Sequence, residues 1–531
     1  MKALFRLAAL TAISVCASSP AFSQLNRLNQ DFDYPWAFRG AGARAAGMGS
    51  AYTAVRDEMF SGTWNPANLA YGEKIYFGAS VGSFMPKGKY DFSSPSYRGE
   101  SEHTGNSLSS LSAMALTLPI TIKNQELAFS ASLYRNFDAF SSYADKLFPS
   151  TPEPIDMTYE RKGGINTFAL GFGTAVNEKL SIGLSVNIYN TFSGPVTAER
   201  RIVETYPNYR PATENIVLQR KTTETDSFSV SGINATLGLS FDWNEATTFG
   251  LAVRTPFKIR IENDNTIEHL VTANGGPAPS VVQFESDTLI NSNVPSRVDI
   301  PLIITLGAAH EWSERFLSTL DFEYGGFSGS MVSVLDETRV SSTGVKEDFF
   351  HEESPEWGNT FSIRTGAEYK LDSKLGAVPL RAGFGFSRLP SRDVTDYRHV
   401  FASHTGASAL PYIADSSLPY IPSSPFGQTY VVDADVAMIQ NANFDYIALQ
   451  HGSQVSSVAF SFGSGLHSPQ RKLDFAYTIT AYSRGFASSQ SNRLPANYFR
   501  QFPYISLLPD SRSSEGKNVD HRFTVSFIGY F

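Results

Sequence analysis

Strict alternation of apolar residues with small or polar residues, repeated along the chain, is the feature that most limits the fold. In the run 180–189, LSIGLSVNIY, every second residue is aliphatic, and the residues between them are Ser, Gly, Ser, Asn and Tyr. The runs 236–243 and 378–387 follow the same pattern. A period of two predicts β-strands with one apolar face. The runs are about 10–14 residues long, close to what a tilted membrane strand needs and above the ~5–6 residues typical of soluble strands.

The connections between these runs alternate in length. Short polar turns join the runs in pairs, at 123–125, 177–178, 244–246, 311–314, 372–374 and 468–470. Long stretches rich in Pro, Ser and charge separate the pairs, at about 86–107, 141–162, 194–227, 262–296, 329–358, 391–452 and 485–517. A membrane barrel has short turns at one end and long loops at the other. In a secreted sandwich or propeller, nothing requires the short and the long connections to lie at opposite ends.

The predicted fold is therefore all-β, a closed 14-stranded antiparallel transmembrane β-barrel that occupies residues 73–531. Strands are expected at about 73–85, 108–122, 126–140, 164–176, 179–193, 228–243, 247–261, 297–311, 315–327, 359–371, 377–390, 454–466, 471–484 and 518–531. The number is even, as in bacterial single-chain barrels. The last strand ends on Phe531, with Phe523, Val525 and Phe527 on the same face, which resembles the C-terminal assembly signal of outer-membrane barrels.

Composition and the N-terminus agree with an exported membrane protein. Only 18% of the 531 residues are charged, below the ~25% of an average soluble protein. The net charge of −8 argues against a nucleic-acid partner. Residues 1–23 have the form of a cleaved signal peptide, with Lys2 and Arg6, an apolar stretch, and Ala21-Phe22-Ser23 before the cut. The only cysteine, Cys16, lies in this segment, so the mature chain has no thiol. No later segment is long and apolar enough for a transmembrane helix.

Residues 24–72 do not alternate and are predicted to form an N-terminal plug, or hatch, inside the barrel. Small residues dominate the segment, which suits close packing in a confined space. Fourteen strands enclose a lumen between the filled interior of about 8 strands and the open channel of about 16–18, so a short segment can block it.

The same segment carries a resemblance to a known family. Gly47, Met48, Gly49, Ser50 and Ala51, followed by Asn65, Pro66 and Ala67, resemble the hatch motif of the FadL-like outer-membrane transporters, which include the TodX-type importers. The hairpin 168–184 and the runs 304–312 and 364–370 are also similar to that family. The resemblance implies a 14-stranded barrel with a hatch, capture of a hydrophobic ligand by outer loops, a kinked third strand and lateral release through the wall. The loops are long for the family, notably 391–452, and the ligand-binding residues of the family have no match here.

The resemblance places a lateral gap near Leu133–Phe140, where Asn136-Phe137-Asp138 interrupts the alternation of the third strand. Leu133, Asn136, Phe137 and Asp138 are the candidates. The expected function is uptake of hydrophobic small molecules, such as long-chain fatty acids or aromatic hydrocarbons, in the outer membrane of a Gram-negative-type bacterium. Transfer of a hydrophobic molecule out of water is favourable by ~0.8 kcal/mol of free energy per methylene. This favours a plugged barrel with apolar pockets over a water-filled pore.

Two alternatives remain open. The plug pattern is equally similar to PorV-type barrels of the same superfamily, which serve protein secretion and transport no small molecule. A general porin fits less well because of the plug. The expected partners are a hydrophobic ligand and outer-membrane lipid, and the expected state is a monomer.

Nothing in the sequence suggests an enzyme, a cofactor or a metal. The nine His residues show no His-Glu-x-x-His spacing, and no Gly-x-Ser-x-Gly elbow occurs. Charged residues fall on the polar faces of predicted strands, where they either avoid lipid or act on the ligand or the plug: Arg364, Glu368, Arg381, Asp321 and Glu323. A lipid-facing Arg at mid-bilayer costs ~2–4 kcal/mol, which is sufficient reason to point inward. In the plug, Asp57 and Glu58 are candidates to pair with such an Arg, and Trp64 is expected to pack or to touch ligand.

Overall fold

The structure is a computed structural model of the whole chain. It describes residues 40–531 apart from 57–59, 73, 95–96, 105–106, 123–124, 140, 148–154, 193, 207–216, 275–280, 341–345, 356, 404–441 and 487–512. The predicted signal peptide 1–23 with Cys16, residues 24–39 of the predicted plug, Asp57 and Glu58, and most of the loop 391–452 lie outside the described residues.

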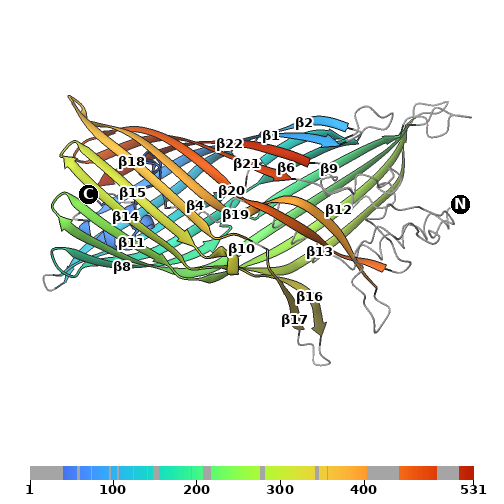
Figure 1. The fold of residues 1–531 in the computed structure, drawn as a ribbon, viewed down its shortest axis with the longest axis horizontal. Helices are drawn as coiled ribbons and strands as arrows, with labels where there is room; N and C mark the ends of the chain where they lie inside the picture. The colour runs from blue at the N-terminus through green and yellow to red at the C-terminus, as the bar shows by residue number, and fades with distance from the viewer. Residues whose placement is uncertain are drawn as a thin grey trace, which may run out of the picture.

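Fourteen antiparallel strands follow one another round a closed cylinder, and the last strand pairs back with the first (Figure 1). In ring order they are β1 (Tyr76–Ser94), β3 (Ser107–Ile122), β4 (Gln125–Asp138), β7 (Gly164–Ala175), β8 (Leu180–Asn190), β10 (Val217–Asn244), β11 (Thr247–Arg254), β14 (Ile303–Ser313), β15 (Phe316–Gly325), β18 (Thr360–Ser373), β19 (Gly376–Ser403), β20 (Ala442–His467), β21 (Arg471–Phe486) and β22 (Ser513–Tyr530). The prediction of a closed 14-stranded antiparallel barrel is confirmed.

Eight further described strands lie at the end with the long connections (Figure 1). They are β2 (Tyr97–Thr104), β5 (Ser141–Leu147), β6 (Ile155–Lys162), β9 (Val196–Tyr206), β12 (Phe257–Asn274), β13 (Val281–Ile300), β16 (Val332–Val340) and β17 (Lys346–Glu353). The predicted strands 247–261 and 297–311 are each divided in two, at Thr255–Pro256 and at Pro301–Leu302. Proline has no N–H to donate to a ladder, so the pairing is interrupted at these points.

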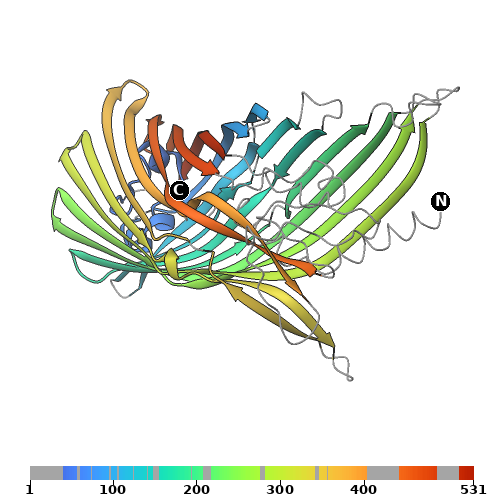
Figure 2. The same cartoon turned by 45° about the vertical axis from the view of Figure 1, so that its right-hand side comes forward.

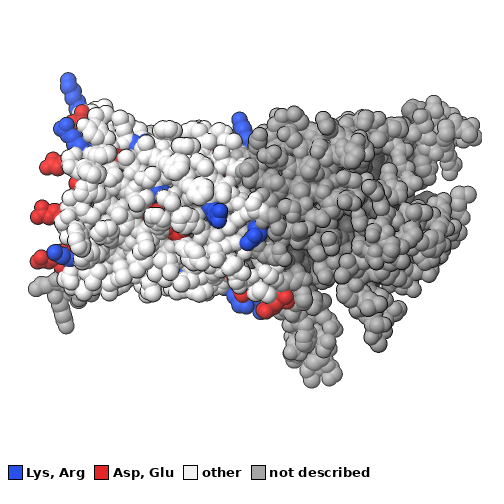
Figure 3. Space-filling model, viewed as in Figure 1, with Lys and Arg blue, Asp and Glu red and all other residues white. Residues whose placement is uncertain are grey.

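The outer face of the ring carries the apolar side of the alternation. On β10, Ile233, Leu237 and Phe241 are exposed, whereas Asn234 and Thr236 are buried on the inward side. On the face drawn in Figure 3, most charged residues lie at the end with the short turns or toward the undescribed part. A band of exposed apolar side chains around a closed barrel is typical of transmembrane β-barrels.

The helices of the described residues are short and lie between 40 and 72, apart from one turn that follows β15. They are α3 (Ala43–Gly47), α4 (Ser61–Trp64) and the 3₁₀ helices η1 (Pro66–Tyr71) and η2 (Phe327–Gly329). Within the described part of the chain, no helix is long and apolar enough to cross a membrane. We call the described residues between 40 and 72 the inner segment, because they contact the inward-facing residues of the ring (Figure 2).

Candidate functional site

The inner segment is shaped by local features at its turns. Gly42 precedes α3 with φ 107°, and Gly49 follows it with φ 66°, conformations that glycine adopts without a steric penalty. Asn65 caps η1, since its side-chain oxygen accepts a hydrogen bond from the N–H of Ala67 at 3.1 Å. Pro66 occupies the first position of η1, where its missing N–H costs nothing.

Glycines on the inward face of the ring receive the inner segment. A side chain at Gly183 or Gly238 would collide with the residues Asn65-Pro66-Ala67. A Cβ on Gly173 would stand 2.7 Å from the carbonyl oxygen of Pro66. Further glycines with the same relation to the segment are Gly250, Gly307, Gly366, Gly383 and Gly463. We call these eight residues the glycine belt; they explain why small residues fill the inward positions of so many strands.

The predicted hatch motif contacts this belt. Gly47 lies against Gly463, where a Cβ on Gly47 would stand 3.1 Å from the Cα of Gly463. Met48 is fully buried and lies over Gly366. The Asn65 amide donates to the carbonyl oxygens of Thr53, at 3.0 Å, and of Leu239 on β10, at 2.9 Å.

Two of the predicted inward charges, Glu368 and Arg381, form one buried ion network with the inner segment. Arg44 of α3 donates two hydrogen bonds to Glu368 on β18, at 2.9 and 2.8 Å. Arg381 on β19 donates to the same carboxylate at 2.6 Å and to Asp474 on β21 at 2.6 Å. His467 lies 2.8 Å from Asp474. The network links the segment to four consecutive strands of the wall, β18 to β21.

A second group of inward charges holds the middle of the segment. One carboxylate oxygen of Asp321 on β15 accepts hydrogen bonds from the N–H groups of Tyr52 and Thr53, at 2.9 and 3.0 Å, and from the Thr53 hydroxyl at 2.7 Å. Arg364 on β18 donates to Glu323 at 3.0 Å. These charges therefore face the segment and one another inside the ring.

The third strand of the ring, β4, loses one of its two neighbours before it ends. Its ladder with β3 stops at the pair Ala113–Tyr134, while its ladder with β7 continues to Asp138 with a register shift between Arg135 and Phe137. The edge of β4 beyond Tyr134 consequently has no β3 partner among the described residues. We call this edge the β4 window.

The four candidate residues for a lateral gap lie at or next to the β4 window, with different orientations. Leu133 shares the outward face with Phe129. Asn136 donates to the hydroxyl of Thr167, and Phe137 is buried. Phe140, the end of the predicted gap, lies outside the described residues.

Asp138 is held by two cations at the window. Its carboxylate lies 3.2 Å from Arg135 on β4 and 3.2 Å from Arg522 on β22. In the ring, β1 and β3 lie between β22 and β4. The ion pair of Asp138 with Arg522 therefore connects β4 to a strand on the other side of the β4 window.

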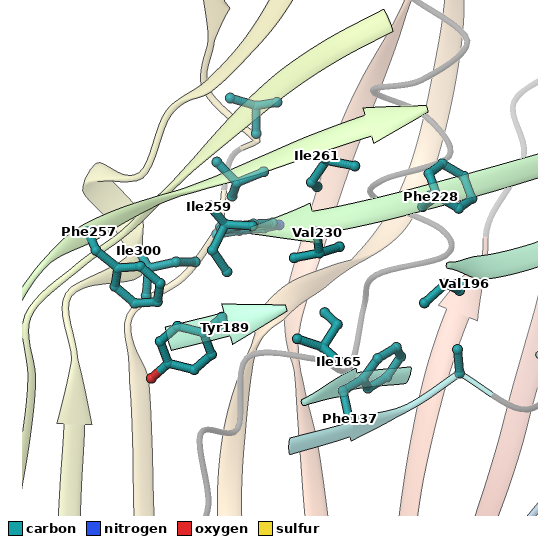
Figure 4. Close-up of a cluster of buried hydrophobic side chains, with 14 of the residues drawn as sticks. Phe137, Ile165, Tyr189, Val196, Phe228, Val230, Phe257, Ile259, Ile261 and Ile300 are labelled. Carbon is teal, nitrogen blue, oxygen red and sulfur yellow. The ribbon is translucent and has the colours of Figure 1, made fainter. Parts of the chain in front are cut away.

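Beyond the inner segment, toward the long loops, the inward face becomes apolar. On β10, Phe228 and Val230 are in phase with the inward residues Asn234 and Thr236. Eighteen buried apolar residues form one cluster, which we call the apolar cluster; Figure 4 shows part of it on neighbouring strands. Its members are Phe137, Ala139, Tyr159, Ile165, Tyr189, Val196, Ala198, Phe228, Val230, Phe257, Ile259, Ile261, Val298, Ile300, Ile303, Phe327, Val332 and Trp357.

A small cavity lies between the inner segment and the apolar cluster. Trp64 and Thr63 line it from the segment, Ile303 from the cluster, and Arg254 and Arg364 from the wall. The Trp64 indole N–H donates to the Ala41 carbonyl oxygen at 3.0 Å, so Trp64 both packs within the segment and faces the cavity. Among the residues described, no group of three or more His, Cys, Asp or Glu is arranged to hold a metal ion.

Sequence reasoning missed the apolar cluster, the role of Arg44 and the glycine belt as a contact surface. It did single out small residues and charge on the inward faces. Asp57 and Glu58, which it named as candidate partners for an inward Arg, lie outside the described residues. The pairs that the structure shows between the segment and the wall are Arg44 with Glu368 and Arg56 with Asp242.

Comparisons with known proteins identify the family. The profile described as outer membrane protein transport protein (OMPP1/FadL/TodX) matches residues 36–398, more than half of the chain. A search of curated proteins finds no match. The solved structures that are similar include a Pseudomonas aeruginosa FadL homologue, with 12% identity over 92% of this chain and 98% of that chain and a TM-score of 0.49. The P. putida toluene transporter TodX has 13% identity over 93% and 99%, with a TM-score of 0.49. The Ralstonia pickettii toluene transporter TbuX has 12% identity over 93% and 100%, with a TM-score of 0.44.

The assignment rests on the family profile, because the identities and TM-scores of these structures are low. It confirms the resemblance found in the sequence. The family is a transport family and not a family of enzymes. The chain belongs to the OMPP1/FadL/TodX family of outer-membrane transport proteins, which carry hydrophobic compounds.

Proposed function

We propose that this protein takes up hydrophobic small molecules, such as long-chain fatty acids or aromatic hydrocarbons, and releases them sideways into the membrane at the β4 window. The observation that carries the proposal is the apolar cluster, which lies inside the ring beyond the inner segment. Lipid explains apolar residues on the outside of a barrel, but it does not explain a buried apolar lining on the inside. A hydrophobic ligand that leaves water there gains ~25 cal/mol per Å² of apolar surface.

The inner segment, as the described part of the predicted plug 24–72, directs the ligand away from the barrel axis. The glycine belt and the ion network of Arg44 and Glu368 hold the segment against the wall. The apolar cluster reaches Phe137 and Ala139 on and just after β4, next to the point where the β3 ladder has ended. The β4 window is therefore the opening that the apolar lining meets first on this side. We also propose that residues 1–23 are a cleaved signal peptide, that the protein is a monomer, and that its outer surface contacts outer-membrane lipid.

Substitution at Ala139 tests lateral release. Ala139 is fully buried beside Phe137, so Ala139→Phe fills the window and is expected to reduce uptake of radiolabelled oleate and toluene to the level of cells without the protein. The control is Ala131→Phe, which adds the same bulk on the outward face of the same strand. Barrel assembly is checked by heat-modifiable mobility on gels, and the smaller Ala139→Val is used if the first variant does not assemble. Undiminished uptake by an assembled Ala139 variant contradicts release at the β4 window.

Native mass spectrometry of the detergent-purified protein separates this proposal from the secretion alternative. A transporter of this kind is expected to retain acyl or aromatic molecules bound in the lumen. Copurified protein partners without any bound small molecule would favour the PorV-like function instead.

A further inference from the structure

The barrel wall has a second discontinuity, at the base of the β16–β17 hairpin. β16 pairs with β13 over three residue pairs only, Ser296–Val298 with Val332–Val334. Within the described residues, β17 pairs with β16 alone. Figures 1 and 2 both show the hairpin projecting away from the cylinder. The wall between β13 and β19 is therefore not closed by a strand ladder at this level.

The base of the hairpin is aromatic and belongs to the apolar cluster. Phe327 of η2 and Trp357 lie with ring centroids 6.1 Å apart, and both are buried. Val332 and Ile300 belong to the same cluster, which ends on the opposite side at Phe137 beside the β4 window. Buried apolar side chains thus run without interruption from the hairpin base to the β4 window.

The hairpin base lies at the border of the lipid-facing band. Gly326 donates to the carbonyl oxygen of Leu302, and Leu302 and Tyr324 are exposed apolar residues of that band. On the other side of the border, the N–H of Asp299 donates to the carbonyl oxygen of Met331, and the Asp299 side chain forms an exposed ion pair with Lys258 at 3.2 Å. The aromatic base is therefore next to the level at which the outer surface changes from apolar to charged.

A side chain of β20 links the residues that follow the hairpin to the neighbouring strands. The amide of Gln454 on β20 donates to the carbonyl oxygens of Asn359, at 2.7 Å, and Leu389, at 2.6 Å. The N–H of Gly358 donates to Pro390 at 2.8 Å. Separate hydrogen bonds of this kind are individually weak, about 0.5–1.5 kcal/mol each, and can open without dismantling a ladder.

We propose that the base of the β16–β17 hairpin is a port through the barrel wall, by which a hydrophobic molecule passes from the border of the membrane into the apolar cluster. Phe327 and Trp357 line the port, and Gln454 keeps it closed between passages. The inference rests on the proposed function and adds the inlet: the molecule enters at the hairpin base and leaves at the β4 window on the other side of the lumen.

A reversible covalent lock tests the port. A Cβ on Gly358 would stand 2.5 Å from the side-chain amide carbon of Gln454, so Gly358→Cys with Gln454→Cys is placed to form a disulfide across the closed port. The only native cysteine is Cys16, inside the predicted signal peptide, so no other thiol interferes in the mature chain. The matched control is Ser387→Cys with Ser457→Cys, which are register partners on β19 and β20 inside an intact ladder.

Uptake of radiolabelled oleate and toluene is measured for oxidised and reduced cells. We expect the oxidised port variant to fall to the background of cells lacking the protein and to recover on reduction, while the oxidised control transports like the wild type. Wild-type transport together with full transport by the oxidised port variant overturns the port and leaves the proposed function standing. A wild type that neither transports nor binds either probe overturns both.

A second variant covers the case in which the double variant does not assemble. Gln454→Glu keeps the size of the side chain but replaces its donating amide with a carboxylate opposite two carbonyl oxygens. We expect a faster uptake than in the wild type, because the closed port loses its two donated hydrogen bonds. Uptake equal to that of the wild type would count against a closing role for Gln454 and against the port.

Discussion

The ion pair of Arg44 with Glu368 allows a quantitative test of how firmly the inner segment is held. The Arg44 side chain is 6% exposed and that of Glu368 is 0% exposed, so neither charge is screened by solvent. Removing one partner of a buried pair costs about 3–5 kcal/mol. We expect about 3 kcal/mol for Arg44→Ala, at the lower end of that range, because Arg381 still donates to Glu368 at 2.6 Å.

The expected consequence is a shift of roughly a hundredfold toward states in which the segment has left the wall, since 1.4 kcal/mol corresponds to a factor of ten. Ser61 is buried in α4, so Ser61→Cys provides a reporter thiol that reacts only when the segment opens. Where opening and closing are fast relative to labelling, the labelling rate follows the open population. We therefore expect Arg44→Ala to speed maleimide labelling of this thiol by about the same factor.

Arg56 is the matched control on the same segment. It pairs with Asp242, but both side chains are 20% exposed, so the pair is partly screened and worth less. Arg56→Ala is expected to change labelling by no more than a few fold. Equal labelling rates for Arg44→Ala and the parent reporter would refute the idea that the buried network holds the segment.

Two further predictions concern the wall. Gly183→Ala places a methyl group against Pro66 and is expected to destabilise the assembled protein by ~1–3 kcal/mol, measured by urea unfolding. The control is Gly329→Ala, which should be neutral because a Cβ at Gly329 would stand in open space. Equal stabilities of the two variants would contradict the role of the glycine belt. Asp138→Asn leaves Arg135 and Arg522 facing each other without their shared carboxylate and is expected to lower the urea midpoint and to raise oleate uptake; an unchanged midpoint would show that the bridge holds nothing.

The ring of strands could be predicted because lipid imposes a simple rule. Outside the barrel only apolar side chains are tolerated, so each spanning strand shows a period of two, and the short turns mark where the strands pair. The fourteen-stranded ring therefore follows from local pattern alone. The partner of each inward charge does not, since the pairing of Arg44 with Glu368 joins residues more than three hundred positions apart.

Part of the apolar cluster, the residues Phe257, Ile259 and Ile261, was missed because one proline exchanges the two faces of a strand. The residues Phe249, Leu251, Val253, Phe257, Ile259 and Ile261 all have odd numbers, so a continuous strand 247–261 places all of them on the lipid face. The structure breaks this strand at Thr255–Pro256, and beyond the break Ile259 and Ile261 are buried while Lys258 and Arg260 are exposed. A shift of one residue in a strand moves every side chain to the other face. Lys258 and Arg260, which alternate with these aliphatic residues, could have revealed the change of face. Charged side chains on the outer surface are compatible with water but not with lipid.

The β4 window and the base of the β16–β17 hairpin are best understood from what fills the barrel between them, the inner segment and the apolar cluster. A path along the barrel axis requires the inner segment to leave, which would expose the glycine belt and strip Glu368 and Asp321 of the partners that the segment supplies. The proposed path across the barrel opens hydrogen bonds at Gln454 and the ion pair at Asp138, while the spanning ladders stay intact. The apolar cluster joins those two places and leads nowhere near the short-turn end. For a molecule whose affinity for apolar surroundings drives its movement, the transverse path costs less and keeps it out of water throughout.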